Sequence, residues 1–273
     1  MTVIASNTAA LRAQNGSRMA NDALNTAMAR LSSGNRINSA ADDAAGLAIS
    51  NSMQSQITGM NQGIRNANDG ISLAQTADGS LDEVTNMLQR VRELAVQAAS
   101  GTYSSDDRDN MQTEVTQLGT QIDSIINNTQ FNNVNIFGTA GAGGTTTIQA
   151  GANSTDTIAI DVGDVSSLVG ATLTVSGTDG TAATATMATV DGLLKTVGTV
   201  RAGLGASESQ LNSAVNNLTN NVTNLSDAKS RISDADFSAE TTNLAKAQIL
   251  NQAATAMLAQ ANQSQQGVLK LLQ

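Results

Sequence analysis

The densest group of ionisable side chains in the sequence is Asp106-Asp107-Arg108-Asp109. Three carboxylates within four residues offer the oxygen ligands that hard cations such as Ca²⁺ prefer. The same pattern is typical of a helix start, where a serine caps the first N–H groups and acidic residues face the positive end of the helix dipole. Ser104 and Ser105 stand directly before the acidic residues. We therefore interpret the cluster as a helix cap and predict no metal site.

Two missing residue types restrict the chemistry further. The 273 residues contain no His and no Cys, which excludes a Ser-His-Asp triad, a thiolate nucleophile and a zinc–thiolate centre. An enzyme that uses a pair of carboxylates, such as a glycosidase, is the alternative that remains. We expect no enzymatic activity, no catalytic residue and no cofactor.

Charge and hydropathy exclude two classes of partner. The net charge is −9, which disfavours binding to the phosphates of a nucleic acid. No run of 18 apolar residues is present, so we expect no membrane-spanning segment. The first residues also lack the basic and apolar regions of a signal peptide, so export would need a dedicated route.

Long helices must position whatever surface carries the function. Apolar residues recur at alternating steps of three and four over 57–98, 111–125 and 190–232, which is the spacing of a coiled coil. We predict a mainly α fold: a coiled-coil-like rod in which the two long helices lie side by side and a shorter helix, 104–127, covers their shared seam.

Both ends of the chain are also expected to be helical. Ala20 to Leu31 and Leu250 to Ala261 follow the same spacing, and Gly34 is placed to end the first of these helices. The segment from Ser39 to Asp43 is predicted to cap the next helix. Paired with each other, these Ala-rich helices still leave apolar surface uncovered, so neighbouring copies of the chain are the natural cover.

The middle of the chain, 139–189, is rich in Gly, Thr and Ala. Apolar residues alternate at Ile158, Ile160 and Val162, and again at Leu173 and Val175, with turn signals between them. This alternation predicts a small β-hairpin region. Because the flanking helices pair, we expect it at the end of the rod distal to the termini.

Several long stretches resemble bacterial flagellin, the subunit of the flagellar filament. The first, LSSGNRINSAADDAAGLAIS at 31–50, is similar to the N-terminal signature of that family. The similarity continues in order along both halves of the chain, at MLQRVRELAVQAASGT (87–102), TQFNNVNIFG (129–138), IQAGANSTDTIAIDV (148–162) and SRISDADFSAETTNLAKAQILNQAATAMLAQANQ (230–263).

The resemblance implies a domain organisation and a function. It implies a structural subunit that polymerises into the filament for swimming motility, with terminal helices that order on assembly and line the central export channel. The expected parts are an inner-core domain, a helical outer-core rod and a β-rich region with a very short variable insert. Their ranges are 1–42 and 233–273, 43–138 and 190–232, and 139–189, respectively.

The resemblance also assigns roles to particular residues. It implies a surface for packing and for recognition by a Toll-like receptor, and on the expected helix Gln89, Arg90 and Leu94 lie outside the buried seam formed by Val91 and Ala95. Three sets of residues follow: for recognition and packing, Gln89, Arg90, Leu94 and Glu114; for the junction between inner and outer core, Asn35, Arg36, Asn38, Asp42 and Asp43; and for C-terminal assembly, chaperone binding and cytosolic innate sensing, Val268, Leu269, Leu271 and Leu272.

Partners and location follow from the same resemblance. The chain is expected to bind itself, an export chaperone, and the filament cap and hook–filament junction proteins, and to be sensed by Toll-like and cytosolic innate receptors. It is expected in the extracellular filament, exported by the flagellar type III route. Two alternatives remain open, a hook–filament junction protein and an additional role as a binder of surface polysaccharide, and Ser and Thr of 139–189 are candidates for O-glycosylation.

Overall fold

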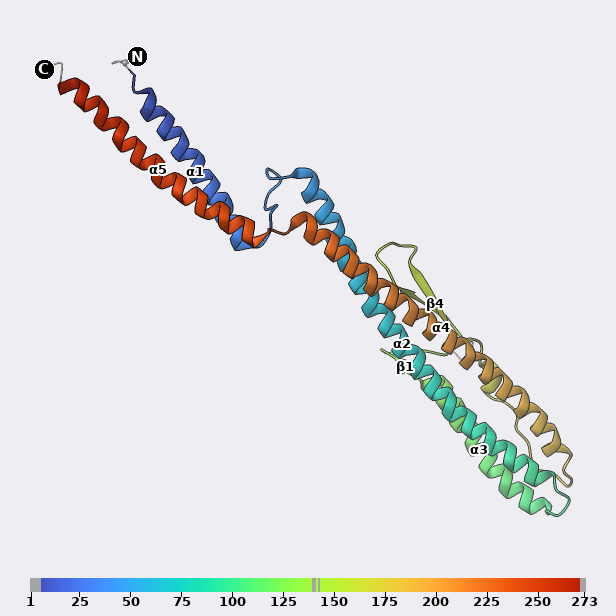
Figure 1. The fold of residues 1–273 in the computed structure, drawn as a ribbon. Coiled ribbons are helices and arrows are strands. Elements are labelled where there is room, and N and C mark those ends of the chain that lie inside the picture. The colour runs from blue at the N-terminus through green and yellow to red at the C-terminus, as the bar shows by residue number, and fades with distance from the viewer. Residues whose placement is uncertain (1–5, 139–140, 142, 271–273) are drawn as a thin grey trace. The chain divides into compact units, whose positions relative to one another are not determined.

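The computed structural model describes residues 6–138, 141 and 143–270, with side chains as far as Ser264. The chain divides into two compact units, residues 1–55 with 224–273 (unit 1) and residues 56–223 (unit 2). The elements are shown in Figure 1. In chain order they are α1 (Thr8–Ser33), α2 (Ala44–Ala99), α3 (Ser105–Asn128), β1 (Gln130–Phe131), β2 (Val134–Asn135), β3 (Thr145–Gln149), β4 (Thr157–Asp161), the 3₁₀ turn η2 (Ser166–Leu168), α4 (Thr181–Ser233) and α5 (Phe237–Lys270).

Unit 1 contains an antiparallel pair of helices, α1 and α5. The side chain of Asn7 caps α1 by accepting a hydrogen bond from the N–H of Ala10, and Gly34 ends it in the left-handed conformation at φ 74°. Asn7 also donates to the carbonyl of Ala261 at 3.2 Å, so the start of α1 lies beside the C-terminal part of α5. The predicted pairing of the terminal helices and the predicted glycine cap are confirmed.

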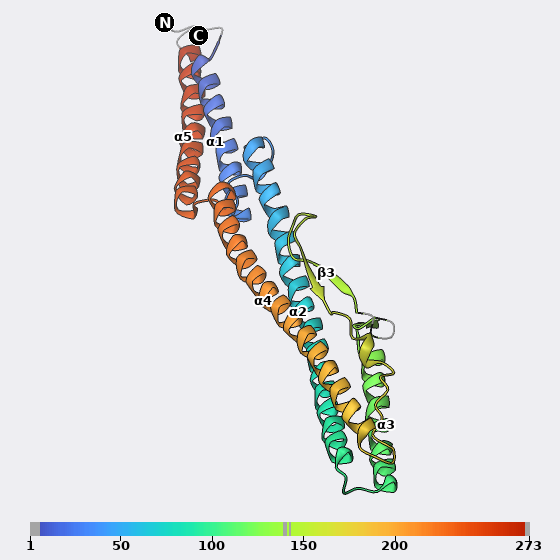
Figure 2. The ribbon, with the colours of Figure 1, turned by 90° about the vertical axis from the view of Figure 1, so that its right-hand side faces the viewer.

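Unit 2 is built on α2 and α4, which lie side by side with α3 covering their seam (Figure 2). The shared core consists mainly of Leu, Ile, Val and Ala, with Met111 and Phe137, and its helical members largely follow the predicted spacing. Its fully buried members include Leu81, Val84, Leu88 and Val91 of α2, Val115, Ile122 and Ile126 of α3, and Leu204 and Leu211 of α4. Helix α3 therefore covers the seam as predicted.

Helix α4 begins at Thr181, earlier than the expected 190. The buried positions Ala183, Thr186 and Val190 continue the steps of three and four. In the first turns of α4 the buried positions are occupied by small or hydroxyl side chains. A pattern of large apolar residues therefore does not include these turns. Asp179 caps the helix by accepting a hydrogen bond from the N–H of Thr181 at 3.1 Å.

Among the residues that the structure describes, two antiparallel hairpins, β1–β2 and β3–β4, form the sheets. The predicted hairpin around Ile158 and Ile160 is confirmed, since β4 pairs with β3 over five residue pairs. The hairpin lies against the α2 segment from Gly59 to Gly70, and not past the far end of the helices. Contact with the backbone of Ala150 and Gly151 is possible because Gly63 has no side chain: a Cβ there would lie 2.9 Å from both.

The second expected β segment, Leu173 and Val175, is not a strand. Its backbone groups are satisfied by side chains from two helices. Gln112 of α3 donates to the carbonyl of Leu173 and accepts from the N–H of Val175, at 2.9 and 2.6 Å. Thr186 of α4 both donates to the carbonyl and accepts from the N–H of Thr174. An amide and a hydroxyl thus replace the partner strand, and the apolar alternation reflects burial against helices.

Candidate functional site

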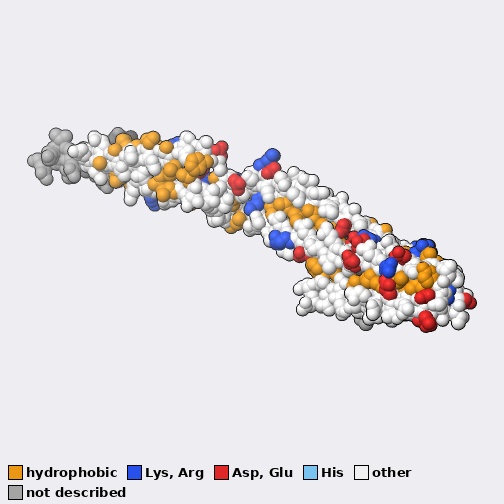
Figure 3. All heavy atoms as spheres, turned by 90° about the horizontal axis from the view of Figure 1, so that it is seen from below, with side chains coloured by type: hydrophobic (Ala, Val, Ile, Leu, Met, Phe, Trp, Pro, Cys, Tyr) orange, Lys and Arg blue, Asp and Glu red, His pale blue; other side chains and the backbone are white. Residues whose placement is uncertain are grey.

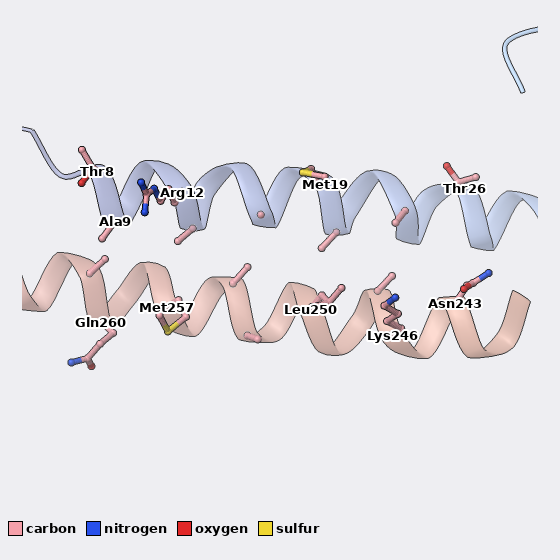
Figure 4. A pocket seen from close by; sticks show the side chains of 18 of the residues that line it. Thr8, Ala9, Arg12, Met19, Thr26, Asn243, Lys246, Leu250, Met257 and Gln260 are labelled. Carbon is pink, nitrogen blue, oxygen red and sulfur yellow. The ribbon is translucent and has the colours of Figure 1, made fainter. Parts of the chain in front are cut away.

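A groove of about 1160 Å³ runs between α1 and α5 in unit 1 (Figure 4). Nine of the 21 residues that line it are Ala or Gly. They are Ala9, Ala13, Gly16, Ala20 and Ala23 of α1 and Ala247, Ala253, Ala254 and Ala261 of α5. Such short side chains leave a gap between the two helices that larger residues would fill. The two helices therefore enclose an open groove, and few of their side chains are buried between them.

The same two helices expose their larger apolar side chains. In α1 the buried residues are Ala20 and Ala27, whereas Met19 is 73 % exposed. In α5, Ile249 and Met257 are 65 % and 63 % exposed. Figure 3 shows the resulting patches of hydrophobic side chains along this pair. Isolated helices obtain most of their stability from packing, and exposed apolar patches of this kind mark interaction surfaces.

Four charged residues line the groove: Arg12, Arg30, Lys246 and Glu240. Glu240 is buried, and the amide of Asn243 lies 3.5 Å from its carboxylate. Arg30 lies 3.9 Å from Asp42, while its Nε is buried without a hydrogen-bond partner among the described residues. Charged residues therefore lie at both ends of the groove, with Arg12 near the start of α1 and Arg30 and Glu240 where α1 ends.

The predicted junction residues lie in the turn that follows α1. Asn35 faces Asp234 in an isolated antiparallel bridge. Arg36 donates from its N–H to the carbonyl of Ser233 at 2.7 Å and from its guanidinium to the carbonyl of Ile232 at 2.8 Å. This turn is therefore bonded to the end of α4 along its backbone, which fixes the two chain segments together within unit 1.

The segment from Ser39 to Asp43 caps α2 as predicted. The capping residue is Asp43, because its carboxylate accepts from the N–H of Gly46 at 2.9 Å. Asp42 accepts from the N–H groups of Asn38 and Ser39 and from the Ser39 hydroxyl. These hydrogen bonds, that from the Ser39 backbone first, hold the pKa of Asp42 below its usual value. Asp42 therefore stabilises the turn and Asp43 the helix.

Three of the four predicted recognition residues form an exposed group in unit 2. Gln89 and Arg90 are exposed on α2, and Arg90 binds Glu114 of α3 at 2.8 Å and Glu93 at 2.6 Å. The hydrogen bonds that Arg90 donates to these carboxylates, that to Glu114 first, raise the pKa of Arg90. Leu94, in contrast, is 2 % exposed and belongs to the core. The expectation that Leu94 faces outward is wrong, because α2 packs against both α3 and α4 and so buries a stripe wider than one heptad seam.

The acidic cluster acts as a helix cap. Ser104 and Asp107 form a capping box with each other's backbone, and Ser104 is the N-cap of α3. The hydrogen bond from the Ser104 backbone is the main cause that lowers the pKa of Asp107. Within the described residues, no three His, Cys, Asp or Glu side chains are grouped as metal ligands would be.

Sequence reasoning missed the role of Arg108, which is buried at the end of unit 2. Its guanidinium donates to three backbone carbonyls, those of Ala98, Ser100 and Thr178, at 2.7, 3.1 and 3.4 Å. These carbonyls come from the end of α2 and from the loop before α4. A charged residue in an acidic stretch is expected at the surface. Arg108 is buried because segments 10 and 70 residues away in the sequence fold against it.

The C-terminal segment is described in part. Val268 and Leu269 lie in α5, but their side chains are outside the described part of the structure, and Leu271 and Leu272 lie beyond it altogether. In the part of the chain that the structure describes, none of the helices combines the length and apolar character needed to cross a bilayer.

Comparison with known proteins identifies the family. The model of the bacterial flagellin N-terminal helical region matches residues 4–142, and that of the C-terminal helical region matches residues 187–272. The chain is 44 % identical to a flagellin of Halalkalibacterium halodurans over 90 % of each chain. It is 42 % identical to a flagellin of Xenorhabdus nematophila and 40 % identical to the flagellar filament 33 kDa core protein of Treponema phagedenis, each over 99 % of both chains.

A solved structure agrees with these relatives. The crystal structure of Bacillus cereus flagellin matches with a TM-score of 0.51 and 32 % identity, over 60 % of this chain and 94 % of that one. The chain belongs to the bacterial flagellin family and is a structural, non-enzymatic subunit of the flagellar filament.

Proposed function

We propose that copies of this chain polymerise through their α1/α5 pairs, and that these pairs order on assembly and line the central channel of the filament. The observation that supports this most directly is the apolar surface of the pair. The buried apolar residues of the two helices, Ala20, Ala27 and Ala247, are all small, while Met19, Ile249 and Met257 remain exposed. Neighbouring copies would bury these side chains and supply the packing that the pair lacks.

The division of the chain supports a separate role for unit 2. Its core joins α2, α3 and α4 and contains the large buried side chains, so unit 2 can fold before assembly. We assign residues 1–42 and 233–273 to the inner core and 43–138 and 190–232 to the outer-core rod, with 139–189 as the β-rich region. The turn from Asn35 to Asp43 is the junction between inner and outer core, and its hydrogen bonds to the end of α4 support that assignment.

Removal of the terminal helices tests the proposal. The full chain, a variant without residues 1–34 and a variant without residues 235–273 would be brought to high ammonium sulfate, which strengthens apolar burial. We expect long filaments by electron microscopy from the full chain alone, with a rise in helical circular dichroism. Both truncated chains should keep a cooperative helical unfolding transition. Filaments from either truncated chain would contradict the proposal.

The remaining partners are proposed from family membership. The end of α5 with Leu271 and Leu272 would bind the export chaperone and be read by cytosolic innate sensors. The filament cap and the hook–filament junction proteins would contact the assembled copies. Export would follow the flagellar type III route to the extracellular filament.

Recognition by a Toll-like receptor is a second proposed role, and the exposed group of Gln89, Arg90 and Glu114 favours it. The ion pair between Arg90 and Glu114 fixes side chains of α2 and α3 on one surface of unit 2. A reporter-cell assay with monomeric protein tests this role. Arg90→Ala should lower signalling at unchanged thermal stability, and unaltered signalling would remove these residues from the site.

A further inference from the structure

One face of α4 in unit 2 is exposed but carries no charge. Between Ser209 and Thr223 ten side chains are exposed, and all ten are Asn, Gln, Ser or Thr. Five of them are Asn212, Asn216, Asn217, Asn220 and Asn221, which we call the asparagine face. The nearest charged residues along the helix are Glu208 and Asp227.

This composition is unfavourable for a helix that merely faces water. Asn is a weak helix former compared with Ala, Lys, Glu or Gln, because its side chain competes for backbone hydrogen bonds. Solvated helix faces are normally rich in charged residues. In the described residues, the side chain of Asn221 bonds to that of Asn217 and the side chain of Asn212 bonds to the carbonyl of Glu208, while the side chains of Asn216 and Asn220 have no hydrogen-bond partner.

Amide side chains already join separate segments elsewhere in this chain. Gln112 of α3 binds the backbone of Leu173 and Val175. Asn66 of α2 donates to the carbonyl of Gln149 in the β3–β4 hairpin at 3.0 Å. In both contacts an uncharged amide on a helix takes up the polar groups of a neighbouring segment without burying a charge.

We infer that the asparagine face is a contact surface for a second copy of this chain, which it binds through amide hydrogen bonds. The inference rests on the proposed polymerisation. Copies that each carry a net charge of −9 repel one another, so they approach most favourably where the surface is uncharged. Asparagine also loses less rotamer freedom than Lys, Arg, Gln or Glu when it is immobilised in an interface.

The test compares three full-length chains: the unaltered chain, Asn216→Ala with Asn220→Ala, and Asn216→Gln with Asn220→Gln. The alanine pair should raise the melting temperature of the monomer, since Ala is the better helix former. It should also raise the monomer concentration needed for filament growth by about tenfold, the effect of losing one or two net hydrogen bonds. The glutamine pair keeps the amides and should assemble within about threefold of the unaltered chain.

The alanine pair should stabilise the monomer and at the same time weaken assembly. A folding defect would lower the melting temperature, so it cannot produce this combination. Assembly of the alanine pair at the concentration of the unaltered chain, or below it, would overturn the inference and leave polymerisation itself intact. If the unaltered chain did not polymerise under the same conditions, the proposed function would fail, and the inference with it.

Discussion

The guanidinium of Arg108 lies 2.7 Å from the carbonyl oxygen of Ala98, and this hydrogen bond ties the first turn of α3 to the last turn of α2. The same side chain holds the carbonyls of Ser100 and Thr178. One buried cation therefore satisfies backbone groups at the end of a helix and in two loops.

Replacement of Arg108 by Ala should lower the free energy of unfolding of the monomer by about 2–4 kcal/mol, because buried carbonyls lose their donors. Urea denaturation followed by circular dichroism measures this. Arg108→Lys is the matched control: it keeps the charge but lacks the planar fork of donors, so its loss should be intermediate. Equal stability of Arg108→Ala and the unaltered chain would show that the loops do not depend on this residue.

Two glycines of α2 should respond in opposite ways to the same substitution. Gly63→Ala should destabilise the protein by about 1–3 kcal/mol, because its Cβ would press on the backbone of Ala150 and Gly151. Gly79→Ala should stabilise it by about 0.5–1 kcal/mol, since the new methyl group meets nothing within 4 Å and Ala favours the helix. The melting temperatures of both variants test this prediction. A shift of the same sign in both would show that the hairpin does not pack closely against α2 at Gly63.

The contribution of Asp42 to stability should depend on pH. Its pKa is below the usual value in the folded state, so the ionised carboxylate stabilises the turn at all pH values above about 4. As the pH falls from about 4 through the lower folded pKa, this contribution is lost. The stability difference between the unaltered chain and Asp42→Asn should therefore be constant from pH 5 to 7 and shrink below pH 4. A difference that stayed the same at pH 2.5 would exclude the charge as its source.

Leu94 and Arg90 should separate folding from recognition. Leu94→Ala removes a fully buried side chain and should cost about 2–5 kcal/mol in the free energy of unfolding. Arg90→Ala breaks an exposed ion pair and should leave the unfolding curve nearly unchanged. Chemical denaturation of the two monomers gives the comparison. A large loss for Arg90→Ala would mean that the pair with Glu114 is structural and unsuited to probe a receptor.

Heptad spacing was sufficient to predict the long helices, the covering role of α3 and the pairing of the chain ends. These features depend on the local periodicity of apolar residues, and it is strong in this chain. The glycine cap at Gly34 and the capping box at Ser104 likewise follow from short-range patterns.

The features that sequence reasoning missed depend on distant contacts. Leu94 is buried because α2 has two partner helices, and a single seam describes only one of them. Leu173 and Val175 alternate like a strand, yet Gln112 and Thr186 take the place of a partner strand. The β3–β4 hairpin can pack beside Gly63 because this residue has no side chain. A pattern of hydrophobic residues contains no information about such a contact.

The pairing of α1 with α5 has a consequence for the order in which the protein folds. Asn7 and Ala261 are 254 positions apart in the chain, so α1 has no intramolecular partner until nearly the whole polypeptide has left the ribosome. Contacts of such long range form slowly, since a large loop must close first. Unit 2 can therefore reach its native structure first, and the two ends of the chain meet last, in keeping with the proposal that the α1/α5 pair orders on assembly.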